Sequence, residues 1–306
     1  MSIYLKLLLA ICIWGFALSL TKHALTEMSP VTLITLRCSL GWLALWGFGG
    51  FRNCLSGWTS GELLKLFVIS TSGVWFHQLV QAYALSRTSA HHAGWLVGAA
   101  PLVTAAVMRY MFSEKLGKLV AAGFGLGFAG GVLIVFSKQS VSGGTVIPTG
   151  FGDFIFISSM LTWALYSIFS SRWFGGRSFL KLTQTNMAIG ALAMLPIFFF
   201  GGYAPQLGQL SPKAWGCVLY LGLLSSALGY YFWNLGVEEL GPSRASAFLY
   251  LEPLTALLGG TLLLGEQPSA MAALGGLLIL YGVYWINGGR VGVRPLKAVY
   301  GLFSRP

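Results

Sequence analysis

Residues 248–266 read FLYLEPLTALLGGTLLLGE, and the organisation of the whole chain can be inferred from this stretch. It is almost wholly apolar, with Glu252 and Pro253 near its start and Glu266 at its end. An earlier stretch at residues 95–114, WLVGAAPLVTAAVMRYMFSE, has the same character. An offset of 152 positions relates Pro101 to Pro253, Glu114 to Glu266, Gly123 to Gly275, and Gly130 to Gly282. We therefore expect a chain built from two related halves.

The composition indicates a membrane protein. Of the 306 residues, 56% are hydrophobic and only 9% are charged, and the mean hydropathy is +0.74. A soluble protein carries roughly a quarter charged residues. Apolar runs of about 20 residues, long enough to cross a bilayer, recur along the chain. The net charge of +11 fits the basic loops of a membrane protein, and the Lys and Arg residues are too dispersed to form a nucleic-acid surface.

Apolar runs bounded by charges, Gly and Pro predict an all-α polytopic protein with ten transmembrane helices. The first run resembles a signal peptide, but Trp14 has a counterpart in Trp163 of the second half, which favours a membrane helix. The predicted spans are Ile3–Leu20, Val31–Phe51, Leu63–Leu85, Ala90–Phe112, Leu119–Ser137, Phe151–Trp173, Leu182–Tyr203, Ala214–Val237, Pro242–Leu264 and Ala270–Asn287. We expect a first five-helix repeat at 1–137, a linker at 138–150, a second repeat at 151–289 and a basic tail at 290–306.

The basic residues predict the orientation. With a cytoplasmic N-terminus, fourteen Lys and Arg residues fall on the inside, and only Lys22, Arg87, Lys138 and Lys213 fall outside. Positive residues accumulate in cytoplasmic loops, so both termini are expected in the cytoplasm. Five spans are an odd number, and the second half therefore enters the membrane from the opposite side. Two repeats of inverted topology that enclose a site at mid-membrane are typical of secondary transporters.

The sequence resembles the drug/metabolite transporter superfamily, and within it the EamA-type transporters. The resemblance covers essentially the whole chain and rests on WGF at 14–16, on Pro30 before Arg37, on AAPL and SEKL at 99–102 and 113–116, and on LEPL and LLGEQP at 251–254 and 263–268. It implies transport of small molecules, mostly the export of amino acids and other metabolites, through a cavity lined by both halves. The sequence departs from symmetry at Ala100, which corresponds to Glu252.

Ionisable groups inside membrane spans are functional candidates, because burying one costs about 2.5–3.5 kcal/mol on insertion scales. Glu252 lies near mid-membrane in the predicted span 242–264. It either carries a coupling proton or contacts the solute, or else it hydrogen-bonds the turn that Pro253 leaves with a free carbonyl. Arg37 is expected to be structural, either neutralising a carboxylate or binding backbone carbonyls. Snorkelling towards the interface is the remaining alternative.

Polar residues in the predicted span 63–85 are the main candidates for solute binding. His77 and Gln81 lie one turn apart on a helix, with Gln78 beside them. The 152-residue offset relates Gln78 and Gln81 to Tyr230 and Trp233, and Asn234 follows directly. We expect these six residues to line a shared cavity; the alternative is a set of interhelical hydrogen bonds. His77 is a second candidate proton carrier.

Aromatic residues are expected on the same axis. Trp14 lies on the first span, and Trp163 and Tyr166 lie on the sixth. Aromatic walls with few polar groups suit amphipathic or aromatic ligands, and core packing is the competing interpretation. Gly123, Gly127 and Gly131 form a GxxxGxxxG pattern, which predicts a close helix contact within the fold or a dimer face.

The sequence therefore predicts a secondary transporter of the bacterial inner membrane that works by alternating access, and the family resemblance implies that it exports amino acids or related amphipathic or aromatic compounds. It contains no Walker motif, its four cysteines are isolated, and the pair His91 and His92 lacks further metal ligands. We expect no cofactor, no metal and a monomer, with a homodimer as the alternative, and with lipid and a coupling proton as partners. A lipid-modifying enzyme and a channel are the competing functions; the enzyme would need clustered acids, a His–Asp pair or a metal set, which the scattered acidic residues do not supply.

Overall fold

The computed structural model describes residues 1–49, 54, 56–87, 93, 96–142, 151–255 and 269–288. Within these ranges the chain is helical and contains no strand. The helices are α1 (Ile3–Ala24), α2 (Pro30–Gly49), α3 (Ser60–Gly73), α4 (Trp75–Arg87), α6 (Ala100–Phe112), α7 (Lys118–Ser142), α8 (Phe151–Phe174), α9 (Phe179–Phe200), the 3-10 helix η2 (Ala204–Gln209), α10 (Pro212–Leu219), the π-helix η3 (Tyr220–Gly229), α11 (Tyr230–Leu240), α12 (Pro242–Ser246), the 3-10 helix η4 (Ala247–Tyr250) and α14 (Ala270–Ile286).

Five helical segments in this part of the chain are long and apolar enough to cross a membrane. They are Ile3–Ala24, Ser60–Arg87, Phe154–Phe174, Phe179–Phe200 and Pro212–Leu240. Ala100–Phe112, Lys118–Ile134 and Ala270–Ile286 are shorter apolar helices. The protein is therefore a multi-pass integral membrane protein, as its composition predicts. The described residues do not include His91, His92, residues 256–264 of the ninth predicted span, Glu266, residues 143–150 of the linker or the tail 290–306.

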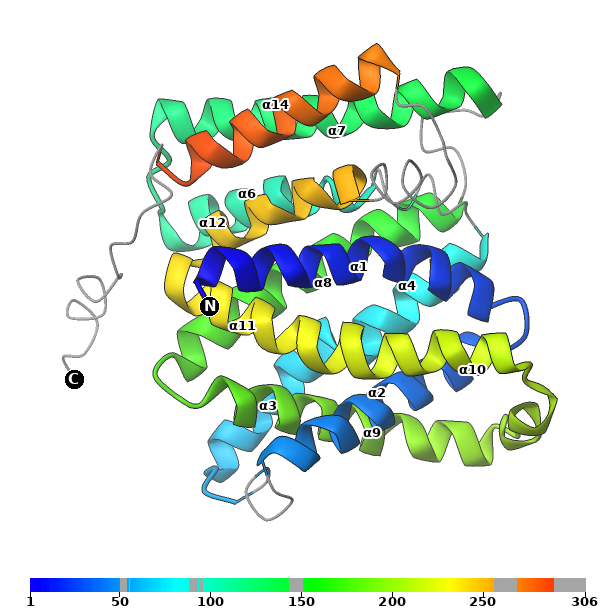
Figure 1. Cartoon of the computed structure of the whole chain (residues 1–306). Helices are drawn as coiled ribbons and strands as arrows, with labels where there is room; N and C mark the ends of the chain where they lie inside the picture. Colours follow the sequence, from blue (N-terminus) through cyan, green and yellow to red (C-terminus); the bar gives the residue numbers. More distant parts are fainter. Residues whose placement is uncertain are drawn as a thin grey trace.

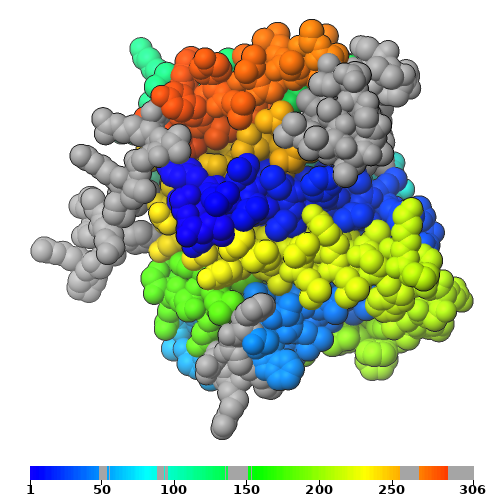
Figure 2. Space-filling model, in the orientation of Figure 1, coloured from blue at the N-terminus to red at the C-terminus, as the bar shows by residue number. Residues whose placement is uncertain are grey.

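The helices run side by side in one bundle, with their axes roughly aligned (Figure 1). Helices α7 and α14 pack against each other at the top of this view, and α2 packs against α9 near the bottom. Helix α1 crosses the visible face between α14 and the α10–α11 segment (Figure 2). Helix α8 packs against α3 and α4, while α1 packs against η3 and α11. The middle of the bundle is thus enclosed by helices from both ends of the sequence.

Glycines bring α7 and α14 into backbone contact. A Cβ atom on Gly123 would lie 2.9 Å from the carbonyl oxygen of Gly282, and one on Gly275 would lie 2.6 Å from that of Gly130. Such close approach requires small residues at both sides of the contact. The helix contact predicted for the GxxxGxxxG pattern is present at Gly123. Gly127 contacts the ring of Tyr250, whereas a Cβ on the third glycine of the pattern would meet open space.

Two helical segments are irregular at matching positions. The predicted span 63–85 is divided at Val74, whose φ of −115° and ψ of −84° leave the helical region. Directly before it, Gly73 packs against the ring of Tyr166 so closely that a Cβ would overlap the ring. The corresponding part of the Pro212–Leu240 segment is the π-helix η3. Such helix interruptions are frequent at functional sites.

Contacts between loops sort the helix ends into two groups. Arg177 pairs with Glu62, and Ser243 donates a hydrogen bond of 2.6 Å to Glu114. We call this the basic end, because its described Lys and Arg residues are Lys6, Lys65, Arg109, Lys115, Lys118, Arg172, Arg177, Lys181 and Arg244. At the opposite end the Ser211 backbone N–H donates to Glu27 at 2.8 Å. The described basic residues of the opposite end are Lys22, Arg87 and Lys213.

Candidate functional site

A cavity of about 90 Å³ lies in the middle of the bundle. It extends from Trp14 and Trp163 towards the opposite end, where Thr21, Leu85 and Phe156 line it. Eight of the eleven candidate solute-binding and ionisable residues from the sequence analysis line it, namely Trp14, Arg37, His77, Gln78, Gln81, Trp163, Tyr230 and Glu252. The described residues contain no cluster of His, Cys, Asp or Glu that could hold a metal ion.

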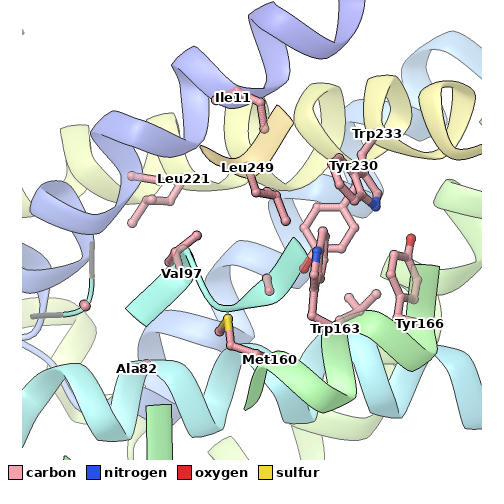
Figure 3. Packing of buried hydrophobic residues seen from close by; sticks show 14 of the residues in the cluster. Ile11, Ala82, Val97, Met160, Trp163, Tyr166, Leu221, Tyr230, Trp233 and Leu249 are labelled. Atoms are coloured by element: carbon pink, nitrogen blue, oxygen red, sulfur yellow. The ribbon is translucent and has the colours of Figure 1, made fainter. Parts of the chain in front are cut away.

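Five aromatic rings pack together on the side of the cavity that faces the basic end. This aromatic cluster consists of Trp14, Trp163, Tyr166, Tyr230 and Trp233, and Figure 3 shows the last four gathered around one point. The centroid of the Trp163 ring lies 5.3 Å from those of Trp14 and Trp233, 5.4 Å from that of Tyr166 and 5.5 Å from that of Tyr230. Most pairs are tilted or edge-to-face, the favourable arrangement for aromatic rings. Packing and cavity lining thus coexist at Trp14 and Trp163.

Three candidates lie behind the cavity wall. Tyr166, Trp233 and Asn234 are buried and are not among the described residues that line the cavity. The Tyr166 hydroxyl donates to Asn234 Oδ1 at 3.0 Å, and Asn234 Nδ2 donates to Thr183 Oγ1 at 2.9 Å. Trp233 Nε1 donates to Ser167 Oγ at 3.1 Å. In this conformation they form the interhelical hydrogen bonds that were the alternative reading of the sequence.

Arg37 is held by serine hydroxyls. Its Nη2 donates to Ser225 Oγ at 3.1 Å and its Nε to Ser226 Oγ at 3.3 Å. The side chain is 9% exposed and borders the cavity. Within the described part of the chain its partners are thus hydroxyl groups, and neither of the two expected kinds of partner, a carboxylate or backbone carbonyls, bonds to it there. Sequence reasoning overlooked this serine pair, although two adjacent serines in an apolar span were visible in η3.

Glu252 borders the cavity from the other side. It is 6% exposed, and its carboxyl group has no hydrogen-bond partner in the described part of the chain. Its backbone oxygen accepts a hydrogen bond of 2.9 Å from Thr255 Oγ1. The side-chain bond to the turn before Pro253, which the structural interpretation requires, is thus not formed there. The carboxyl group is available to a proton or a solute.

The polar residues of α4 are anchored from α8 and α11. His77 Nδ1 lies 2.9 Å from Thr162 Oγ1, and Gln78 Nε2 donates to the Tyr230 hydroxyl at 2.9 Å. The Tyr230 hydroxyl in turn donates to the Gly73 carbonyl oxygen at 2.8 Å. Gln78 and Tyr230, which the 152-residue offset relates to each other, are therefore in direct contact. Thr162 carried no signal in the sequence, because a lone threonine in an apolar helix most often bonds its own backbone.

The comparisons with known proteins agree with this architecture. A family model described as the EamA-like transporter family matches residues 1–136 and 150–288. An uncharacterized transporter of Bacillus subtilis, YyaM, is 25% identical over 94% of each chain, and one of Archaeoglobus fulgidus is 28% identical over 92% of this chain and 96% of its own.

A probable terminal-alkyne amino-acid exporter of Streptantibioticus cattleyicolor is 25% identical over 76% of each chain. A solved crystal structure matches this fold with a TM-score of 0.73 at 20% identity, covering 93% of this chain and 96% of that chain. Matches to both segments of the family model span nearly the whole sequence. The chain belongs to the EamA-like transporter family, and the protein is a membrane transporter of the drug/metabolite type.

Proposed function

We propose that the protein is a secondary transporter that exports a small amphipathic solute, an amino acid or a related aromatic compound, by alternating access. The observation that carries the proposal is the central cavity. It combines aromatic faces at Trp14 and Trp163 with a cation at Arg37 and a carboxyl group at Glu252. Arg37 suits a carboxylate, Glu252 suits an amine, and the rings suit an apolar side chain.

The α7–α14 contact supports an architecture of inverted repeats. Gly123 packs against Gly282, and Gly130 packs against Gly275. The 152-residue offset relates Gly123 to Gly275 and Gly130 to Gly282, so it converts one contact into the other. Two copies related by a twofold axis would produce such a pair of contacts. We therefore propose ten spans in two repeats at 1–137 and 151–289, joined by a linker at 138–150 and followed by a basic tail at 290–306.

The distribution of charge sets the orientation of the proposed transporter. The basic end faces the cytoplasm, both termini lie there, and the membrane is the bacterial inner membrane. The cavity extends towards the opposite end, so the conformation described here corresponds to the outward-facing state. The aromatic cluster closes the path to the cytoplasm.

The three residues behind the cavity wall belong to the inward-facing state of the proposed transporter. Gln81 and Ala82 line the present cavity, and the offset relates them to Trp233 and Asn234. When the two repeats exchange conformations, these two residues, with Tyr166 beside them, line a cavity that opens to the cytoplasm. The solute meets Trp14, His77, Gln78, Gln81, Trp163 and Tyr230 from one side, and Tyr166, Trp233 and Asn234 from the other.

Energy for the cycle comes from a gradient, with Glu252 or His77 as the carrier of a coupling proton. The test is counterflow in liposomes that contain the purified protein, with labelled amino acids, amphipathic cations and nucleosides in turn. We expect saturable, trans-accelerated uptake of an amino acid. Conductance without saturation indicates a channel and contradicts the proposal. Unchanged pH-dependent flux in both Glu252→Gln and His77→Ala excludes these coupling residues.

A further inference from the structure

His77 and Thr162 form a hydrogen bond whose direction is fixed by a third group. His77 Nδ1 lies 2.9 Å from Thr162 Oγ1, and Thr162 Oγ1 donates to the Ser159 carbonyl oxygen at 2.7 Å. A threonine hydroxyl has one hydrogen, and here it points to Ser159. Towards His77 the oxygen can therefore only accept. Nδ1 of the neutral imidazole carries the hydrogen, and Nε2 carries the lone pair.

The second ring nitrogen of His77, Nε2, is available to an occupant of the cavity. His77 lines the cavity and is 3% exposed, and within the described residues Nε2 has no hydrogen-bond partner. The ring of Trp163 covers one face of the imidazole, with centroids 5.4 Å apart and an angle of 30° between the planes. Thr162 and Trp163 together hold the ring in one orientation. The imidazole therefore presents a fixed acceptor to whatever occupies the cavity.

Two other residues that line the same cavity carry acceptors without a partner in the described part of the chain. Gln78 Oε1 is buried and has no partner among the described residues, and the carboxyl group of Glu252 also lacks one there. Buried acceptors without partners are costly, which makes an occupant with several N–H groups the favourable one. A primary amine carries up to three such donors. Arg37, the cation that lines this cavity, donates to two serine hydroxyls and is not one of these acceptors.

We propose that Thr162 is a positioning residue that holds His77 as the Nδ1–H tautomer, and that Nε2 accepts a hydrogen bond from the amino group of the solute. This inference rests on the proposed function, because it takes the central cavity as the transport site. Thr162 acts through His77 and thereby determines which end of the solute His77 binds. No bond is made or broken in the process.

The first test is the tautomer itself. Nitrogen-15 NMR of histidine-labelled protein at neutral pH distinguishes Nδ1–H from Nε2–H, and a His77→Gln protein assigns the signal among the four histidines. We expect Nδ1–H in the unaltered protein and in Thr162→Ser, at an excess of roughly tenfold from one net hydrogen bond. In the isosteric Thr162→Val protein the Nε2–H form should rise. A dominant Nε2–H signal in the unaltered protein overturns the proposal.

The second test uses two matched probes, L-phenylalanine and 3-phenylpropionate, which lacks the amino group. We expect Thr162→Val to weaken L-phenylalanine binding about tenfold and to leave 3-phenylpropionate within about twofold, with Thr162→Ser close to the unaltered protein. Equal weakening of both probes indicates a general structural role and contradicts the proposal. If neither probe binds the unaltered protein, the proposed solute class is wrong, and so is the proposed hydrogen bond from its amino group to His77. The tautomer of His77 is tested separately by the NMR measurement.

Discussion

Gln78 and Tyr230 lie 152 positions apart in the sequence and are joined by a hydrogen bond of 2.9 Å. This is the offset that relates the two stretches around Pro101 and Pro253. Residues related by a twofold axis can touch each other only on or near that axis. The contact therefore places the proposed axis through the centre of the bundle, beside the cavity that both residues line.

Removing the Tyr230 hydroxyl should destabilise the bundle. In Tyr230→Phe the buried Gln78 amide loses its acceptor and the Gly73 carbonyl oxygen loses its donor. Interhelical hydrogen bonds in membranes contribute about 0.6–1.7 kcal/mol, so we expect a loss of about 1–2 kcal/mol. Unfolding in mixed detergent measures it. Tyr231→Phe, the neighbouring residue in the same helix, is the control and should change stability little; an equal loss in both variants contradicts the prediction.

The glycine contact between α7 and α14 makes a second prediction. A Cβ on Gly130 would lie 2.8 Å from the backbone nitrogen of Ile279 and closer still to the Gly275 carbonyl oxygen, so Gly130→Ala forces the helices apart. We expect a loss of about 1–3 kcal/mol. Gly125→Ala, at an exposed site on the same helix with open space around the Cβ, should be neutral or slightly stabilising. Equal thermal stability of the two variants is the result that refutes this packing.

The loop contact at the opposite end should respond to pH. The backbone N–H and hydroxyl of Ser211 donate to Glu27 and, with His23 and Lys213 nearby, hold its pKa below the usual value of 4.5. A lowered pKa means that the contact stabilises the fold above that pH and is lost as the pH falls through the folded-state pKa. Glu27→Gln should thus lower Tm at pH 7, and the difference should shrink below pH 4.5. Exposed Glu239→Gln is the control, and a pH-independent difference for Glu27→Gln argues against an ionised contact.

Much of the fold was predictable from the sequence, because hydropathy and the 152-residue offset are local and repetitive signals. They indicated the membrane class, the helical content and the corresponding positions of Gln78 and Tyr230, but not that these two residues bond to each other. The break at Val74 was not predictable, since the apolar pattern runs through it and only the close packing of Gly73 on Tyr166 reveals it. Ser225 and Ser226 stand out as adjacent serines in an apolar span, but their contact with Arg37 was not predictable, because spacing within one helix does not show which distant helix it meets.

The candidate site was likewise only partly predictable from the sequence. Residue type and position predicted the cavity lining at His77, Gln78 and Gln81, because polar groups in apolar spans are costly and therefore informative. The sequence did not show that Trp233 and Asn234 lie behind the wall in this conformation. Sequence periodicity describes one helix at a time, whereas the exposure of a residue to a cavity depends on how several helices pack against one another.

Thiol labelling should separate the two proposed states. In a protein whose four cysteines are replaced by alanine, Gln81→Cys should react with a membrane-impermeant reagent applied from the outside, because residue 81 lines the present cavity. Asn234→Cys should react from the cytoplasmic side alone. Conditions that raise the reactivity of one should lower that of the other, since a single two-state equilibrium governs both.

The matched control is Leu223→Cys, which lies on the same helical segment as Asn234 but is 41% exposed on the outer surface of the bundle. Facing lipid, it should resist the reagent from both sides and under all conditions. Labelling of residues 81 and 234 from the same side contradicts the inverted repeats. Reactivities that rise and fall together contradict alternating access, because in that mechanism the outward and inward cavities are never open at once.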